Sequence, residues 1–539
     1  VAVTGVQTCA LPIFTLRPPS QWKIIGTSVP RLDIELKCTG RAKYNVDFRM
    51  PGLLHAAVKR SPVRGSKVKS VDGSAVIGKP GIKSVENLGY GVAVVSTDPW
   101  TARNALKQVK VTWEANEYDN LTSDIIAKNY SDALANTPGK VATNEGDVEA
   151  AAKAPGAKVI ETEYIVPFLH HMCMEPMGST AFVHDGICEM WAPTNGASNL
   201  VNGIAFLLNV PPEKVVVHRS EFIGGSFGRR DRLDQDLEAV QLSQKLGAPV
   251  QVIQSREDDL ASAYYRPFQK TKMRAVVDKD GNLAAWSHKV ASQAIAHSGH
   301  DLSELAWAGV DMAKMEPYLK AGGSPFYTMP FDFFSVSNTP FGWPYAVPNV
   351  HVEVLEMEGP LKPTYWRSVG TSGNIFQIES MMDEMAIAAN ADPMAFRRKL
   401  IAEKHPRGVK VLDELAAMCG WPGIQKVGTG TGWGLGFMNG FGGYGAIAVQ
   451  VQVQNKKVTI KRVCGVADQG VTVNKDQTEA QWQGGIVDGL ATACLQQVTV
   501  SKGAVVQSNW GAYPTFTLRN VPPIEFKTVE SGPGGMGGL

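Results

Sequence analysis

The sequence predicts a multidomain protein that combines the α/β and α+β fold classes. Its 539 residues exceed what one simple core accommodates, so we expect two to four domains. Apolar residues make up 44% and charged residues 19% of the chain, as in folded globular proteins. Apolar runs of strand length alternate with stretches of helical spacing, which is typical of strands that alternate with helices.

Charge and cysteine content argue against several functional classes. The net charge is only +2 with both signs interspersed, so neither nucleic acid nor an anionic membrane is expected as the main partner. No apolar stretch approaches the length of a membrane span. The seven cysteines form no CxxC pair, and His170-His171 and the pair His297/His300 lack a third ligand at suitable spacing. We therefore predict no zinc ribbon, iron–sulfur cluster or side-chain metal site on this chain.

The first region, up to about residue 160, predicts a compact α/β unit. Residues 1–13 are left out of it, because they resemble a translated sequencing adapter and lack the basic region and apolar core of a signal sequence. Strands are expected at 53–61, 91–97 and 110–114, with a helix at 98–109 capped by Asp98 and begun by Pro99. Residues 116–158 are polar and rich in alanine and lysine, and predict helix and connector.

The second region, 161–360, predicts strands that alternate with helices. A strand at 188–195 precedes a helix at 197–210, and residues 215–253 read as strand, loop, helix and strand. Residues 270–292 predict a hairpin around Asp280-Gly281. The Pro-, Gly- and aromatic-rich stretch 321–350 predicts irregular structure.

The third region, 361–539, opens with a predicted helix that follows a loop containing Gly370 and Gly373. Its apolar positions are Ile375, Phe376, Ile378, Met382 and Met385. A second helix is expected from Asp392-Pro393 to residue 404. Alternating residues 446–468 predict a hairpin at Asn455, and 477–498 predict a helix.

Three glycine-containing loops, each expected between a strand and a helix, are the strongest chemical signal. They comprise residues 224–228, 367–374 and 468–474. Free backbone N–H groups at a helix start bind anions, so three such loops favour a multi-phosphate or oxyanionic cofactor. The first loop lacks both GK[ST] and G-x-G-x-x-G, which excludes a P-loop and a Rossmann fingerprint. It does spell G-x-S-x-G around Ser226, so a serine hydrolase remains an alternative.

Taken in order, several segments resemble the large, molybdenum-cofactor-binding subunit of the xanthine oxidase family. The branch they resemble most is that of isoquinoline 1-oxidoreductase beta subunits and aldehyde oxidoreductases. Residues 37–62 and 91–106 resemble its a/b-hammerhead domain, and 222–230 ("FIGGSFGRR") its cofactor loop. Residues 365–386 and 467–490 resemble two later motifs. The resemblance implies a hammerhead domain with connector at 14–160 and molybdopterin-binding domains at 161–360 and 361–539.

The resemblance also implies roles in the first loop. The backbone around Phe227 and Gly228 is expected to hydrogen-bond an oxo ligand of molybdenum, with Gly225 and Ser226 in the same cofactor loop. Phe227 is expected to wall the substrate pocket. G-x-S-x-G is then incidental.

Roles outside that loop follow in the same way. Arg367 is expected to lie beside the pocket and stabilise negative charge developing on the substrate. Asn195 stands where the family commonly has glutamine near the metal. Gln481 matches the glutamine that contacts the pterin dinucleotide. His171 and Glu175, in "HHMCMEP", are expected to be buried and structural.

The implied activity is hydroxylation of aldehydes or N-heteroaromatic compounds with water as oxygen source. The implied cofactor is molybdenum–molybdopterin cytosine dinucleotide, with electrons passing to a separate [2Fe–2S] subunit and a cytochrome c as a candidate acceptor. Gly538 occupies the place of the family's catalytic glutamate, so we expect the 539-residue chain alone to be inactive. A cofactor-free scaffold is therefore the main alternative, and the hydrolase ranks last. Localisation, periplasmic or cytoplasmic, stays open.

Overall fold

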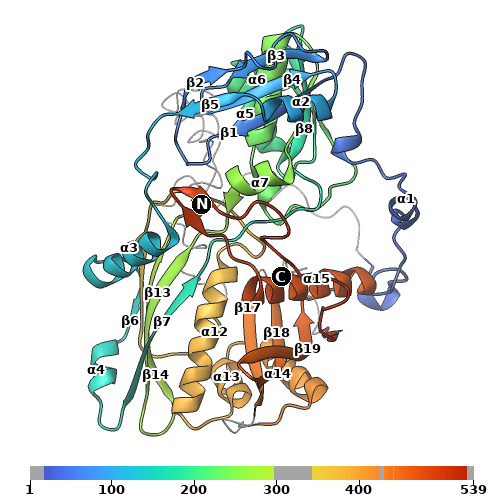
Figure 1. Cartoon of the computed structure of the whole chain (residues 1–539). Coiled ribbons are helices and arrows are strands. Elements are labelled where there is room, and N and C mark those ends of the chain that lie inside the picture. The colour runs from blue at the N-terminus through green and yellow to red at the C-terminus, as the bar shows by residue number, and fades with distance from the viewer. Residues whose placement is uncertain (1–16, 296–342, 424–429, 441, 531–539) are drawn as a thin grey trace.

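The computed structural model divides into an upper part built on one large sheet and a lower part built on two (Figure 1). The structure describes residues 17–295, 343–423, 430–440 and 442–530. Residues 1–13, His297, His300, most of 321–350 and Gly538 lie outside this part of the chain. No helix among the described residues is long and apolar enough to cross a membrane.

The upper part is a seven-stranded sheet of order β10-β9-β8-β11-β1-β4-β3. Its strands are β1 (Leu54–Arg60), β3 (Ile82–Asn87), β4 (Gly91–Ser96), β8 (Gly178–His184), β9 (Ile187–Ala192), β10 (Val215–Arg219) and β11 (Val250–Ile253). β1 pairs in parallel with β11, Leu54 opposite Val250, so one sheet spans the first and second predicted regions. All six residues of β4 are buried, because helices cover both faces of the sheet.

The helices of the upper part form two apolar cores with this sheet. α5 (Ala197–Leu208) and α6 (Asp234–Leu246) pack on one face, and α2 (Pro99–Leu106) packs on the other. Two short strands, β2 (Val68–Asp72) and β5 (Lys110–Trp113), pair beside α2.

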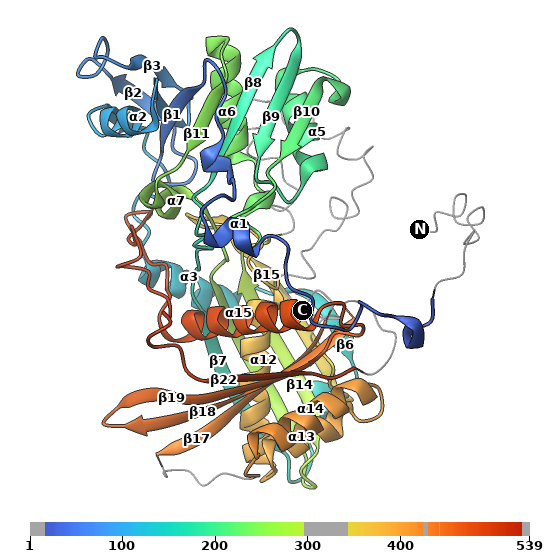
Figure 2. The ribbon, with the colours of Figure 1, turned by 90° about the vertical axis from the view of Figure 1, so that its right-hand side faces the viewer.

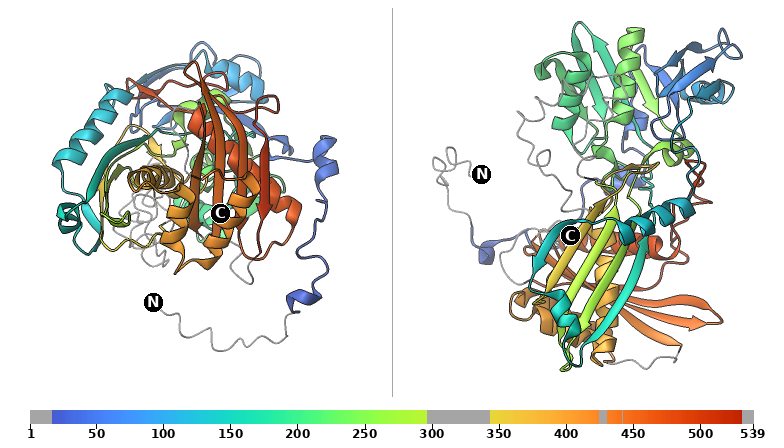
Figure 3. Two further views of the ribbon diagram at one scale, coloured as in Figure 1. Left: turned by 90° about the horizontal axis from the view of Figure 1, so that it is seen from below. Right: turned by 90° about the vertical axis from the view of Figure 1, so that its left-hand side faces the viewer.

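The first sheet of the lower part has five strands in the order β6-β15-β14-β13-β7. They are β6 (Lys140–Glu145), β7 (Lys158–Val166), β13 (Gln269–Val277), β14 (Leu283–Ser292) and β15 (Val350–Glu356). α12 (Thr371–Ala388) packs on one face. α3 (Ser123–Asn136) lies against the other face (Figure 3), where Lys270 of β13 donates a hydrogen bond to Ser131.

The second lower sheet, β17-β18-β19-β22, shares a core with the first. It contains β17 (Thr431–Gly440), β18 (Gly443–Gln454), β19 (Lys457–Asp468) and β22 (Ile524–Thr528). α13 (Pro393–Ile401) and α14 (Pro406–Cys419) pack with α12 in this core, while α15 (Lys475–Cys494) crosses the sheet on its other face (Figure 2).

The remaining elements are short. They are α1 (Ile34–Cys38), α4 (Val148–Lys153), α7 (Arg256–Ser262), β12 (Tyr264–Tyr265), β16 (Lys362–Pro363), β20 (Val500–Ser501), β21 (Ala504–Val505) and the 3-10 turns η1 (Pro19–Gln21), η2 (Asn45–Asp47), η3 (Pro212–Lys214) and η4 (Arg229–Asp231).

Most predicted elements are confirmed, including their caps. The Asp98 side chain accepts from the Thr101 N–H at the start of α2, and Asp392 does the same for Ala395 at the start of α13. Both hairpins turn where expected, with positive φ at Gly281 and Asn455. These local signals suffice because a cap or a tight turn needs only neighbouring residues.

Two expectations were wrong. Residues 140–145 form β6, not connector, because β15, about two hundred residues later, supplies its ladder partner. Phe376 was expected on the buried face of α12 but is 51% exposed, while Asn374 and Gln377 are completely buried. The five-stranded sheet thus covers a more polar face of this helix than apolar spacing indicates, with Gln377 hydrogen-bonded to Gln269 and His288.

Trp286 tests the shared lower core, where it is 1% exposed. Trp286→Ala should lower the free energy of unfolding by about 3–5 kcal/mol, because it leaves a large cavity. The measurement is thermal and urea unfolding followed by circular dichroism. Trp100, which is 69% exposed on α2, is the matched control, and its replacement by alanine should change stability little. Equal losses for the two variants would contradict this core assignment.

Candidate functional site

The glycine loop at 224–228 is shaped by close packing and by left-handed backbone angles. Gly225, Phe227 and Gly228 have φ of 94°, 54° and 101°. A Cβ on Gly228 would overlap the Tyr365 carbonyl, and a Cβ on Gly224 would overlap Glu175. Glycine is therefore required at both positions for contact with neighbouring chain segments.

The loop does not lead directly into a helix, contrary to expectation. Gly228 precedes only the single 3-10 turn η4, and α6 begins at Asp234. The amide N–H groups of residues 225–228 donate to no residue within the described ranges. These amides are thus available as donors. They belong to the loop backbone, where Phe227 and Gly228 are left-handed, and not to the first turn of α6.

Ser226 is held by amide donors. Asn195 Nδ2 donates to Ser226 Oγ at 2.6 Å, and the Arg230 N–H lies 3.4 Å from the same oxygen. Among the residues that the structure describes, no histidine hydrogen-bonds Ser226. The arrangement lacks the base that a serine nucleophile needs, which argues against the hydrolase.

Arg367 faces the glycine loop from the second loop. Its Cζ lies 6.0 Å from the centroid of the Phe227 ring, and its Nη2 donates to the Gln481 carbonyl at 2.9 Å. The structure therefore brings together Phe227, Arg367 and Gln481, and Asn195 joins them through Ser226. The Gln481 side chain is exposed, so its contact here is made by the backbone.

The Asp488 carboxylate lies near Arg367 but is not hydrogen-bonded to it. Asp488 Oδ2 lies 3.8 Å from Nη1, beyond hydrogen-bond distance. Burial lowers the pKa of Arg367, and burial raises the pKa of Asp488, each opposed by the partner's charge. Because desolvation outweighs attraction for both groups, the positive charge is only partly compensated and could stabilise an anion.

A second unsatisfied polar group lies in the first turn of α12. Asn374 is completely buried, and neither its amide oxygen nor its nitrogen has a partner in the described part of the chain. Ser368 and Val369, just before the helix, are left-handed at φ 63° and 57°. A buried amide without partners is costly, and the 0% exposure of Asn374 leaves no space beside it for a ligand atom.

The third loop, 468–474, offers less than expected. Asp468 is bound by both Nε and Nη2 of Arg407, and its Oδ1 also accepts from the Gly470 N–H. At the start of α15, the Lys475 N–H donates to the Thr27 carbonyl, and the Gln477 N–H to Asn474 Oδ1. The N-terminal segment therefore covers the first amide of this helix, and the anion site expected at loop 468–474 stays a prediction.

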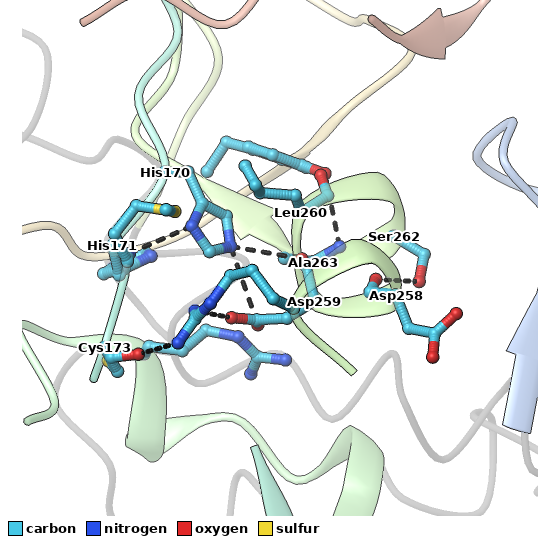
Figure 4. Close-up of polar contacts among 12 residues, drawn as sticks. His170, His171, Cys173, Asp258, Asp259, Leu260, Ser262 and Ala263 are labelled. Atoms are coloured by element: carbon cyan, nitrogen blue, oxygen red, sulfur yellow. Dashed lines mark hydrogen bonds and ion pairs between the residues drawn. The ribbon is translucent and has the colours of Figure 1, made fainter. Parts of the chain in front are cut away.

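His170 and His171 are both buried, as predicted for His171. Figure 4 shows His170 beside Asp259. His170 Nε2 lies 3.1 Å from the Asp259 carbonyl and 3.6 Å from its carboxylate. Burial would raise the pKa of Asp259, but His170, Arg229 and Arg256 lower it to about 2. His171 Nε2 instead donates to the Tyr365 carbonyl at 2.6 Å. Neither histidine belongs to a metal-binding group, since no three His, Cys, Asp or Glu residues in the described ranges form one.

Glu175 and Arg230 form the contact that the sequence did not reveal. Glu175 was expected to be buried, and it is, but the arginine at the end of the "GGSFGRR" stretch gave no sign of being its partner. Asp488 was missed as well. Only the burial expected for "HHMCMEP" indicated that Glu175 needs a partner, because Glu175 and Arg230 lie far apart in the sequence.

Comparison with known proteins shows which protein family the chain resembles. Models described as a molybdopterin cofactor-binding domain match residues 133–321 and 376–522, together more than half of the chain. The chain is 29% identical to the beta chain of isoquinoline 1-oxidoreductase from Brevundimonas diminuta over 96% of its own length. It is 24% identical to one subunit of nicotinate dehydrogenase from Pseudomonas putida over 95% of its length. It spans 64% and 43% of those two relatives.

Solved structures share the fold. Quinoline 2-oxidoreductase from Pseudomonas putida 86 superposes with a TM-score of 0.75 at 15% identity, covering 96% of this chain and 93% of that one. Aldehyde oxidoreductase from Desulfovibrio desulfuricans gives a TM-score of 0.72 at 15% identity, covering 97% and 78%. The multidomain α/β architecture predicted from the sequence is therefore confirmed.

His171 should make the protein sensitive to acid. Burial, followed by the charge of His170, lowers the pKa of His171 to about 3, so the ring is neutral in the fold. The unfolded chain binds a proton near pH 6.5, and stability from this group is lost as the pH falls from about 6.5 towards 3. His171→Gln keeps a donor for Tyr365 but cannot titrate. In the parent protein this group should lower the free energy of unfolding by about 1 kcal/mol for each pH unit below 6.5, and the variant should lack that loss. The measurement is urea unfolding at pH 7.5, 6 and 5. An unchanged pH slope would show that His171 is not buried in neutral form.

Proposed function

We propose that this chain, which belongs to the xanthine oxidase family of molybdopterin-binding proteins, is the large subunit of a molybdenum hydroxylase. Its substrates are aldehydes or N-heteroaromatic compounds, as the names of the relatives suggest. The observation that carries the proposal is the meeting of Phe227 and the incompletely paired Arg367 beside a loop of free amide donors.

The residues present fit a molybdopterin cofactor. The loop 225–228 offers N–H groups that have no acceptor among the described residues, and its glycines allow close approach. These groups would hold polar atoms of the cofactor, with Asn195 orienting Ser226 from behind. When bound, the molybdenum centre supplies the oxygen-transfer and two-electron redox chemistry of the reaction.

The protein's own contribution is placement and charge. The Phe227 ring, 37% exposed, offers a flat apolar wall against which a planar substrate can lie. Arg367 stabilises negative charge that develops on the substrate, because its guanidinium is partly desolvated and makes no hydrogen bond to Asp488, 3.8 Å away. The family resemblance puts the general base at position 538, where this chain has glycine, so we expect the chain as given to lack that base.

The finer assignments rest on the family resemblance. We propose the cytosine dinucleotide form of the cofactor, with Gln481 beside it, a separate small [2Fe–2S] subunit as electron acceptor, and a cytochrome c beyond it. The 14–160, 161–360 and 361–539 division remains a prediction. Metal analysis of the full-length protein co-expressed with its small subunit tests the proposal, since a scaffold would hold no stoichiometric molybdenum.

Arg367→Ala should lower kcat/KM of the complete enzyme by about 30- to 1000-fold, as expected for the loss of a charge-stabilising contact worth about 2–4 kcal/mol. Melting temperature should change far less. The measurement is steady-state kinetics with an aldehyde and an N-heterocycle. Arg398→Ala is the control, because Arg398 pairs with Asp413 on the surface, remote from the loops. Unchanged turnover with a large fall in melting temperature would indicate a structural ion pair at Arg367.

Gly228→Val should reduce molybdenum content severalfold. Its side chain would overlap the Tyr365 carbonyl and cannot easily adopt φ of 101°, so the free N–H groups would move. Gly186→Val separates strain from position, because Gly186 has φ of 73° with open space around it in the β8–β9 turn. Molybdenum content equal to that of the parent in the Gly228 variant would refute the role of this loop.

A further inference from the structure

The segment from His170 to Glu175 lies close to both loops of the candidate site, 224–228 and 367–374. It belongs to neither loop, but its residues contact the first loop and also Tyr365 and Trp366, which immediately precede the second. The Cys173 thiol donates to the Ser226 carbonyl at 3.3 Å, and burial raises its pKa to about 12, so it stays a donor. Arg256 fixes the segment by donating to the Cys173 and Met174 carbonyls.

Glu175 binds the glycine loop directly. Its Oε2 accepts from the Gly224 N–H at 3.0 Å, and its own N–H donates to the Gly224 carbonyl at 3.0 Å. The same carboxylate pairs with Arg230 at 3.1 Å, and Arg230 Nε donates to the Gly225 carbonyl at 2.6 Å. The Glu175 carboxylate and the Arg230 guanidinium therefore hold Gly224 and Gly225, the first two residues of the glycine loop.

Glu175 also ties the loop to the N-terminal part of the chain. Its second oxygen, Oε1, accepts from the Asn45 N–H at 3.0 Å. Asn45 is 3% exposed, and its carbonyl accepts from Gln251 of β11. One carboxylate thus joins the N-terminal segment, the glycine loop and Arg230.

His171 performs the matching task for the second loop. It donates to the carbonyl of Tyr365, the residue against which Gly228 packs and which lies two positions before Arg367. The distance between the amide donors and the guanidinium is therefore set through one short segment, and both of its anchoring side chains are buried.

We propose that Glu175 is a positioning residue for the site, with His171 as its counterpart on the Arg367 side. Its carboxylate sets where the 225–228 donors lie relative to Arg367, and thereby controls cofactor retention and transition-state stabilisation. The Glu175 side chain itself hydrogen-bonds neither the 225–228 amides nor Arg367. The cofactor part of this inference rests on the proposed function, whereas the ordering of the loop does not.

The experiment compares Glu175→Gln with Glu379→Gln in the full-length protein with its small subunit. Glu379 is a matched control, because the Glu175 and Glu379 side chains are both 6% exposed and each pairs with a buried arginine, Arg230 and Arg397 respectively. Glu379 lies in the α12 core, away from the loops. Both variants should lose melting temperature, since each removes a carboxylate from a buried guanidinium, although Arg397 keeps a second partner in Asp383 at 2.6 Å.

Only Glu175→Gln should lose molybdenum severalfold and lower kcat/KM of the molybdenum that remains. In hydrogen exchange of the apoprotein, the hydrogen-bonded amides of Asn45, Glu175 and Gly224 should exchange about tenfold faster in Glu175→Gln than in Glu379→Gln. Glu175→Asp keeps the charge but cannot span Gly224 and Asn45 together, so it should resemble Glu175→Gln.

Several results would overturn the positioning role. They are parent-like exchange of the loop in Glu175→Gln, equal molybdenum loss in the Glu379 control, or full recovery in Glu175→Asp, which would mean that charge alone matters. A parent protein without molybdenum would instead refute the proposed function, and the exchange measurement would still decide whether Glu175 orders the loop.

Discussion

A buried network of arginines and carboxylates fixes the chain immediately after the glycine loop. Arg229 binds Asp234 through two hydrogen bonds of 2.9 and 2.8 Å, and Arg60 of β1 bridges Asp234 and Glu238. Removing one member of such a network leaves an uncompensated buried charge, which typically costs about 3–5 kcal/mol. Because Arg229 is tied to the first turn of α6, the chain enters the helix by a 3-10 turn, and the loop is left with its own free donors.

The local parts of the fold could be predicted from the sequence, whereas the non-local parts could not. The cap at Asp98 and the turn at Asn455 involve only residues a few positions apart. β6 depends on β15, and the parallel pairing of β1 with β11 joins residues about two hundred positions apart. No periodicity within the 140–145 segment reports a partner that the fold brings from elsewhere.

The site shows the same division. The loop glycines and Arg367 are visible as a motif, because glycine is required wherever backbone segments touch and φ is positive. The sequence placed the donors at a helix start, and the structure places them in a left-handed loop before a 3-10 turn. It could not pair Glu175 with Arg230 or set Asp488 near Arg367, because both distances follow from how sheets and helices pack.

Within the proposed function, the electrostatics at Arg367 would favour a neutral planar substrate over one that is already anionic. The guanidinium contacts an aromatic ring at 6.0 Å and a backbone carbonyl at 2.9 Å, and Asp488 stands 3.8 Å away. A substrate anion would be attracted by Arg367 but repelled by Asp488, so its ground state would gain little net stabilisation. Charge that develops near the Phe227 face during the reaction would feel mainly the guanidinium. Stabilisation that grows towards the transition state in this way raises kcat, and does not merely tighten substrate binding.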